Sequence, residues 1–364
     1  MNRTQVVQAY IQGIFDQIDN PLTRQTAFKH TYGVAQNCAL LAHQRGLDPE
    51  LSTVMGLLHD LYSFQTGIST LHAPNGSEMV RVLLKKDFKD LFSAEEQLLI
   101  KSAIYHHSDK DLMHDEYDEL LKDADLLQLY LTNPVLDSRY KKRISKIAAE
   151  LNLAPVTSFS HTPSVPYTFQ RTDIANIAQD LAQKKIIGSK DDTDFMNIIR
   201  HYPESSAFDE LRHAWCAAFV YHCCIKAGLE LPIRLPCHGM ELANCRFACV
   251  IAWFEWATQN EFIHKENTSF TPERGDIVIY NQIIPSQNKP ENSLWCDHMG
   301  IVLSTTKDSL IVAEGNVDNQ NCSGIVTRKR DQTIGYYVRI PNDYEYTDWK
   351  IDYKTGKIKE SLFI

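Results

Sequence analysis

Three features that mark other classes of protein are missing from this sequence of 364 residues. It has no run of about 18 apolar residues, so we expect no membrane-spanning helix. Residues 1–8 lack the apolar run of a signal peptide, which favours a cytoplasmic location and leaves export by a non-standard route open. The formal net charge of -9 argues against the broad basic face that general nucleic-acid binding requires.

Cysteine is scarce in the first half of the sequence, where only Cys38 occurs, although the whole chain has nine. An odd number of cysteines in a long chain favours free thiols over a disulfide framework. No pair of Cys-x-x-Cys motifs occurs, which argues against a structural zinc site of that type. We therefore expect most of the cysteines to be packing residues.

The hydrophobic pattern changes type along the chain. Up to about residue 150, apolar residues recur at spacings of three and four, and Ser93-Ala94-Glu95-Glu96 is the capping box of a predicted helix. Residues 155–166 are rich in Pro, Ser and Thr, which predicts a connection between domains. Helices are then predicted over 173–185 and 212–226. Short apolar runs predict strands over 276–280, 299–303, 309–313 and 335–340.

The first group of candidate functional residues falls in the helical half. His30, the adjacent pair His59-Asp60, and Asp125 offer imidazole and carboxylate donors, which suit a transition metal. Adjacent His and Asp side chains diverge on a regular helix, so both can reach one metal only at a helix terminus. We expect such a terminus at Leu58-His59-Asp60.

The ordered series His30, His59-Asp60, His106-His107 and Asp125 resembles the HD superfamily of metal-dependent phosphohydrolases over about residues 20–150. The resemblance implies an all-α helical bundle with His30, His59, Asp60 and Asp125 as metal ligands. It also implies one or two divalent ions, either a transition metal (Mn, Fe, Ni, Co or Zn) or Mg. Such an ion would activate water to attack a phosphate ester.

Further residues are candidates for contacts around this site. Extra histidines of some family members bind a second metal or the substrate, and the matching positions here are His72, His106 and His107. Arg139 and Arg143 lie one turn apart on a predicted helix and are candidates for binding phosphate, although a solvated helix face is the favoured explanation.

The second group of candidate residues follows the predicted connection. Cys216 precedes small residues at a predicted helix start, where the helix dipole favours a thiolate. His298 precedes one strand and Glu314 ends the next, so adjacent antiparallel strands would bring a base and its orienting acid together.

Four segments of this half resemble the CHAP amidases, a papain-like cysteine family, over about residues 173–340. They are Trp215-Cys216-Ala217-Ala218, Arg274-Gly275-Asp276-Ile277-Val278, Asp297-His298-Met299-Gly300 and Glu314-Gly315-Asn316. The resemblance implies Cys216 as nucleophile, His298 as base, Glu314 as the residue that orients His298, and Asn316 as an auxiliary polar group. The implied substrate is an amide of peptidoglycan type, or an intracellular peptide or polyamine amide.

We therefore expect a multidomain protein, with an all-α HD bundle followed by an α+β papain-like CHAP domain with an antiparallel sheet. The expected boundaries are 1–153 for the HD domain, 154–172 for a linker, and 173–364 for the CHAP domain with a C-terminal hairpin. The expected function is a bifunctional hydrolase. In the alternative, the HD domain is a non-catalytic nucleotide sensor that regulates the amidase. Nothing in the sequence bears on oligomeric state or on coupling between the domains.

Overall fold

The computed structural model describes residues 2–133, 135–154, 157–160, 169–236, 245–266, 269–285, 287 and 295–358. The chain divides into two compact units. The first contains the described residues up to 160 together with 347–358, and the second contains nearly all of those from 169 to 346. The C-terminal segment thus belongs to the helical unit, whereas the sequence led us to expect it in the second domain.

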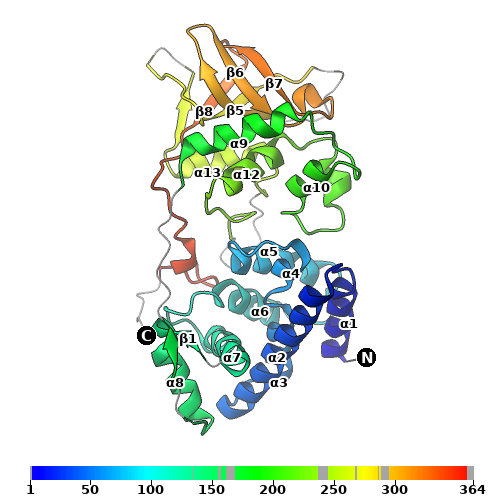
Figure 1. The fold of residues 1–364 in the computed structure, drawn as a ribbon, viewed down its shortest axis with the longest axis vertical. Coiled ribbons are helices and arrows are strands. Elements are labelled where there is room, and N and C mark those ends of the chain that lie inside the picture. The colour runs from blue at the N-terminus through cyan, green and yellow to red at the C-terminus, as the bar shows by residue number, and fades with distance from the viewer. Residues whose placement is uncertain are drawn as a thin grey trace. The chain divides into compact units, whose positions relative to one another are not determined.

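The first unit is a helical bundle (Figure 1). Its longest helix, α2, packs against α3 and α7, and α5 packs against α6. A two-residue parallel pairing of β1 (Leu136–Asp137) with β2 (Phe159–Ser160) follows the helices. The helices are α1 (Arg3–Phe15), α2 (Pro21–Arg45), α3 (Pro49–Leu58), α4 (Leu61–Thr66), α5 (His72–Lys85), α6 (Ala94–His106), α7 (Glu116–Thr132) and α8 (Lys141–Glu150).

Local sequence signals fix several ends of these helices. Ser93 caps α6 as predicted, because its side chain accepts from Glu96 N–H while the Glu96 carboxylate accepts from Ser93 N–H. Asn20 and Asp48 cap α2 and α3, each ahead of a proline at the first helical position. Gly46 ends α2 in the left-handed conformation, with φ of 71°.

The second unit is an α+β fold around a six-stranded antiparallel sheet of order β3-β8-β4-β5-β6-β7. The strands are β3 (Ile263–Lys265), β4 (Ile277–Asn281), β5 (Cys296–Thr305), β6 (Ser309–Glu314), β7 (Gly324–Lys329) and β8 (Ile334–Val338). The helices are α9 (Arg171–Gln183), α10 (Thr193–Ile199), α11 (Ala207–Leu211), α12 (Cys216–Lys226) and α13 (Val250–Gln259). Figure 1 shows α9, α12 and α13 gathered beside the sheet.

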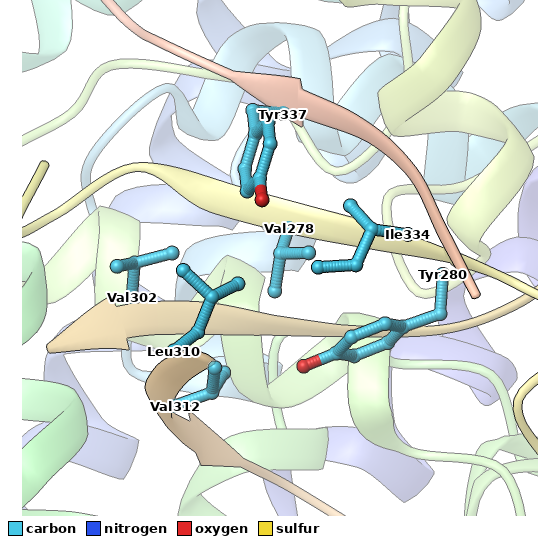
Figure 2. Close-up of a cluster of buried hydrophobic side chains, with 7 residues drawn as sticks. All are labelled: Val278, Tyr280, Val302, Leu310, Val312, Ile334 and Tyr337. Atoms are coloured by element: carbon cyan, nitrogen blue, oxygen red, sulfur yellow. The ribbon is translucent and has the colours of Figure 1, made fainter. Parts of the chain in front are cut away.

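A buried apolar cluster holds the central strands of the sheet together (Figure 2). Its members come from β4, β5, β6 and β8: Val278, Tyr280, Val302, Leu310, Val312, Ile334 and Tyr337. Tyr280 belongs to this cluster, yet its hydroxyl reaches the carboxylate of Glu314. The hydrophobic core therefore also fixes a polar group of the site described below.

The predicted C-terminal hairpin is present as a single antiparallel bridge between Ile351 and Ile358, with a turn at Gly356. Its backbone contacts the helical unit, since Tyr353 N–H donates to His106 Nε2 at 3.3 Å. The Tyr353 ring also lies 5.1 Å from the ring of Tyr105. No helix in the described part of the chain is long and apolar enough to cross a membrane.

Candidate functional sites

Four side chains meet between the helices of the first unit. His30 projects from α2, His59 and Asp60 lie where α3 gives way to α4, and Asp125 projects from α7. His30 Nε2 lies 3.2 Å from His59 Nε2, 3.3 Å from Asp60 Oδ2 and 3.4 Å from Asp125 Oδ1. The four groups thus direct their donor atoms at a common point.

The break between α3 and α4 is what lets adjacent His59 and Asp60 face that point together. Helix α3 ends at Leu58, and Asp60 leaves the helical conformation with φ of -105° and ψ of 10° before α4 begins at Leu61. The expected helix terminus at this pair is confirmed. His59 Nε2 and Asp60 Oδ2 are 3.5 Å apart.

Two more histidine nitrogens lie near the second carboxylate oxygen of Asp60. Asp60 Oδ1 is 3.3 Å from His72 Nε2 and 3.4 Å from His107 Nε2, and these two nitrogens are 3.0 Å apart. The carboxylate of Asp60 therefore stands between two donor groups, as a carboxylate shared by two ions does.

The ring orientations suit metal binding. His59, His72 and His107 each donate from Nδ1 to a backbone oxygen, at 2.8, 2.9 and 2.7 Å. These bonds place the lone pair on Nε2, the atom that faces the cluster. Lone pairs that meet at about 3 Å repel one another unless a cation lies between them, so this donor set fits one or two divalent transition metals.

The charge states also suit a ligand set. Burial lowers the pKa of His59 to about 4, which keeps its imidazole neutral at pH 7. Burial alone would raise the pKa of Asp125, but Lys110 and the neighbouring histidines lower it to about 2. Burial is likewise outweighed at Asp60, whose pKa the histidines hold well below its ordinary value. Neutral imidazoles and ionised carboxylates are the forms that bind metals.

The cluster opens into a cavity of about 540 Å³. Besides the candidate ligands, the walls carry two cations, Lys29 and Lys110, and the aromatic rings of Phe64 and Tyr140. Lys110 Nζ donates to Asp125 Oδ2 at 2.7 Å. A negatively charged group next to the cluster would therefore meet a fixed ammonium ion at the cavity wall.

The second site lies in the sheet unit, where Cys216 begins α12, His298 lies on β5 and Glu314 ends β6. All three side chains are buried. His298 Nε2 donates to Glu314 Oε2 at 2.9 Å. His298 Nδ1 is buried without a nitrogen or oxygen partner among the described residues, and the ring interacts with the thiol of Cys216. The order thiol, imidazole, carboxylate is that of a thiol hydrolase.

Electrostatics in this site favour a charged imidazole. Burial alone would lower the pKa of His298, but the neighbouring Cys216 and Glu314 outweigh burial and raise it to about 10. Burial alone would raise the pKa of Glu314, whereas His298 and Arg328 lower it to about 2. Glu314 is therefore ionised and can stabilise an imidazolium next to the thiol.

Two glycines permit the close approach of the elements that carry these groups. A Cβ atom on Gly300 of β5 would lie 2.7 Å from Cγ of Glu314, so glycine leaves room for the carboxylate beside His298. A Cβ atom on Gly315 would lie 2.5 Å from Cβ of Phe219 and 2.9 Å from the Trp215 ring. Glycine here lets the end of β6 approach the start of α12, where Cys216 lies.

Comparison with known families matches each unit to a different domain. Residues 27–130 match the HD domain and residues 208–316 match the CHAP domain. The chain is a fusion of an HD domain and a CHAP domain. Comparisons with curated proteins and with solved structures find no match. The family resemblance and the fold class expected from the sequence are confirmed, and the two domain types support a hydrolase.

Within the HD domain, the structure separates two neighbouring histidines that the sequence placed together. His107 faces Asp60, whereas His106 turns away from the cluster. His106 stacks on His114, with ring centroids 3.7 Å apart, and accepts the N–H of Tyr353. The structure therefore does not bring His106 to the cluster around Asp60, because adjacent residues near a helix end point in different directions.

His106, Asp109 and His114 form a further cluster of metal-binding residue types. Its chemistry does not suit a cation, because Lys122 Nζ lies 2.6 Å from His114 Nδ1 and also donates to Leu112 O and Glu119. An ammonium donor on Nδ1 leaves the ring proton of neutral His114 on Nε2, the nitrogen that is 3.8 Å from Asp109 Oδ2. We assign no metal there.

The predicted phosphate-binding arginines do not line the cavity of the metal cluster. Arg139 is exposed and lies over the ring of Tyr140. Arg143 is buried, where it pairs with Asp123 at 2.7 Å and with Glu119 at 2.8 Å. Arg143 contributes instead to a separate cavity of about 340 Å³. A guanidinium already paired with two carboxylates has little capacity for phosphate. The structure brings neither arginine to the lining of the cavity beside the metal candidates.

In the described part of the chain, no hydrogen bond joins Asn316 to His298. Its side chain donates to His213 O and Asn319 Oδ1, both at 2.9 Å, and accepts from Asn321 N–H at 2.8 Å. Asn321 in turn accepts from Trp215 Nε1 at 3.2 Å. Asn316 thus organises the loop that holds Trp215, the neighbour of the thiol, rather than the imidazole.

Three residues at the two sites were not found from the sequence. Lys110 contacts Asp125, while Tyr280 and Arg328 both contact Glu314. Lys110 follows His106-His107-Ser108 closely, so its proximity to a candidate ligand was a usable signal. Tyr280 and Arg328 belong to strands whose sequences contain no catalytic motif, and only the pairing of β4, β5, β6 and β7 brings them to Glu314.

Proposed function

We propose that the protein is a bifunctional hydrolase, in which the HD domain hydrolyses a phosphate ester and the CHAP domain hydrolyses an amide. The observation that carries the first activity is the convergence of four side chains: His30 Nε2 lies 3.2–3.4 Å from donor atoms of His59, Asp60 and Asp125, and His59 Nε2 lies 3.5 Å from Asp60 Oδ2. His72 and His107 on the second oxygen of Asp60 support a two-ion site. We propose these six residues as the ligands.

When bound, divalent ions would supply a Lewis acid for the phosphoryl oxygens and a nucleophilic water. The chain itself contributes orientation and charge. The Nδ1–H bonds of His59, His72 and His107 hold the rings in place. Lys110 lies where it can pair with a phosphate oxygen of the substrate. Phe64 and Tyr140 provide apolar surface for the group that the phosphate carries, which fits a nucleotide-like ester.

Metal content and turnover test this proposal together. We expect the full chain to retain one or two divalent ions and to release phosphate or a phosphate ester from a panel of phosphorylated metabolites. Asp60→Asn should lose both metal and turnover, whereas Asp90→Asn, at an exposed position of the same domain, should keep both. Metal-loaded protein that binds nucleotides without turnover would instead support the sensor hypothesis. Protein without affinity for divalent ions would refute the HD proposal.

For the CHAP domain, the proposal rests on the buried hydrogen bond between His298 and Glu314, and on Cys216, which lies close enough to His298 to raise the pKa of its imidazole. We propose that Cys216 Sγ attacks the carbonyl carbon of an amide while first-turn N–H groups of α12 hold the oxyanion. His298 gives its proton to the departing amine, leaving a thioester on Cys216. Water then attacks the thioester and loses a proton to His298, which releases the acid and regenerates the thiol. Glu314 keeps the imidazole oriented.

Trapping of the thioester tests this step. We expect mass spectrometry of full-length protein mixed with peptide and polyamine amides to find an acyl adduct on Cys216. His298→Ala should prevent the adduct, whereas Cys322→Ser, which changes a thiol outside the site, should form it normally. A panel of peptidoglycan-type, peptide and polyamine amides would distinguish the substrate classes. An adduct on another cysteine, or one that survives His298→Ala, would refute the proposed roles.

A further inference from the structure

The carboxylate of Glu314 has a cationic partner outside the CHAP match. Arg328 lies on β7, beyond residue 316 where that match ends. Its Nε donates to Glu314 Oε1 at 2.9 Å and its Nη2 to Glu314 Oε2 at 2.5 Å. Tyr280 Oη on β4 donates to Oε1 at 2.7 Å. Nothing in the match to the CHAP domain assigns a role to either residue.

We propose that Arg328 is a positioning residue, assisted by Tyr280, which fixes Glu314 toward His298 and sets the pH range in which Cys216 is a reactive thiolate. The proposal rests on the proposed amidase function of the Cys216–His298 pair. It adds a residue that touches neither the thiol nor the imidazole and acts on both through the carboxylate.

Hydrogen bonds from three residues fix the orientation of the Glu314 carboxylate. Glu314 is fully buried, and its two oxygens accept four hydrogen bonds from Tyr280, His298 and Arg328. The bidentate guanidinium sets the plane of the carboxylate. Oε2 then holds His298 Nε2 and limits rotation of the ring. His298 Nδ1, which is buried without a hydrogen-bond partner among the described residues, is left as the nitrogen that can serve Cys216.

Stacking holds the same arrangement from the side. The Arg328 guanidinium carbon lies 5.5 Å from the centre of the Tyr280 ring, within the range of a cation–π contact. The Tyr280 ring lies 5.8 Å from the His298 ring at an interplanar angle of 16°. Tyr280 therefore contacts the guanidinium and the imidazole by its faces and the carboxylate by its hydroxyl.

Arg328 also supplies positive charge beside Glu314. The titratable and charged groups around the carboxylate come from Cys216 of α12, Tyr280 of β4, His298 of β5 and Arg328 of β7. Asp318 pairs with Arg328 at 3.0 Å, and Cys249 and Cys296 lie near Cys216. Arg328 is the one permanently charged cation among these described groups. Its removal would leave Glu314 uncompensated, and a more negative site binds protons more tightly at both His298 and Cys216.

The pH dependence of Cys216 alkylation tests the proposal in the full chain. Iodoacetamide labelling, read for the Cys216 peptide by mass spectrometry, should give an acid limb for thiolate formation and an alkaline limb for His298. In Arg328→Met, both limbs should move upward by about one pH unit, because one nearby positive charge is lost. Arg328→Lys keeps the charge and should return the limbs close to the wild-type pH.

Two controls make each outcome decisive. Arg330→Met removes an arginine near the same strand, where it pairs with Glu266 away from the thiol, and should leave the profile unchanged. Tyr280→Phe removes a hydrogen bond but no charge, and should move the limbs by less than half as much as Arg328→Met. Limbs that stay in place in Arg328→Met, or move equally in Arg328→Lys, would overturn the proposal. A wild-type Cys216 with a single limb near pH 8.5, as for a free thiol, would instead refute the proposed amidase mechanism.

Discussion

The two sites of this chain handle buried charge in different ways. In the HD domain, two carboxylates and four imidazole nitrogens face one another across 3.0–3.5 Å, with lone pairs directed inward. In the CHAP domain, the single carboxylate of Glu314 is fully paired by His298, Arg328 and Tyr280. The first arrangement would be completed by a cation from solution, as we propose, whereas the second contains its own cation in Arg328.

This difference teaches how each site should respond to its surroundings. A cluster of ligands gains its stability from metal binding, so it should be sensitive to chelators. A network closed by an arginine should be insensitive to chelators and sensitive to pH, because its groups gain or lose protons. Four measurements test whether the two sites differ in this way.

The largest effect should come from removing the reactive group of each site. Chelation of divalent ions should lower phosphohydrolase turnover by about a thousandfold or more and leave amidase turnover unchanged. Cys216→Ala should give the reverse pattern of losses. Steady-state rates on one phosphate ester and one amide, measured on the same preparation, check both halves. Loss of both activities after either treatment would contradict the separation of the two sites.

Next in size is the buried arginine of the HD domain. Arg143→Met removes a buried cation that pairs with both Asp123 and Glu119. Because Arg45 and Lys122 still pair with these carboxylates, we expect a loss of about 3 kcal/mol of unfolding free energy, at the low end for a broken buried ion pair. Arg139→Ala removes an exposed arginine nearby and should leave stability almost unchanged. Urea unfolding followed by circular dichroism distinguishes them. Equal stability of the two variants would mean that Arg143 is not needed for the fold of this domain.

A smaller effect is expected at the cavity wall. Lys110→Met should lower phosphohydrolase turnover about a hundredfold while the bound metal stays, because a fixed charge next to the phosphate is lost. Arg139→Ala should keep wild-type turnover. Measuring the bound metal together with the turnover rate shows whether Lys110 acts on the substrate or supports metal binding. Metal loss in Lys110→Met would show that the lysine instead supports Asp125.

The smallest expected effect is a loss of unfolding free energy at acidic pH. The pKa of Glu314 falls from its ordinary value of 4.5 to about 2 in the folded state. A depressed carboxyl pKa stabilises the fold above pH 4.5, and this stabilisation is lost as pH falls toward 2. Between pH 5.5 and pH 3, wild-type protein should lose about 2 kcal/mol more unfolding free energy than Glu314→Gln. Urea midpoints followed by tryptophan fluorescence give the difference. Parallel losses in both proteins would place the acid sensitivity elsewhere.

Much of this organisation was predictable from the sequence because it depends on local pattern. The capping box at Ser93, the helix end at His59-Asp60 and the strands around 277–281 and 309–314 follow from short-range signals. The candidate residues His30, His59, Asp60 and Asp125 do come together, as the resemblance implied.

The features that the sequence did not predict depend on side-chain direction and on long-range packing of helices and strands. His106 and His107 are equivalent in sequence, yet only one faces Asp60, since their directions depend on how α6 ends. Arg143 resembles a surface residue until α8 packs against the segment that carries Asp123. Arg328 lies on the edge strand β7, whose alternating polar pattern contains no catalytic signal, and only the strand order places it at Glu314.

The position of the C-terminal hairpin has a consequence for how the molecule is made. Tyr353 and Lys354 contact His106 and Asp115 of the helical unit, although the whole CHAP domain separates them along the chain. A ribosome must therefore finish the CHAP domain before the HD domain can acquire its last contacts. Proteolysis just after residue 346 would also remove the contact of Tyr353 with His106, the last residue of α6. Because His107 follows directly, we expect loss of the tail to weaken the proposed metal site although the tail contains none of its ligands.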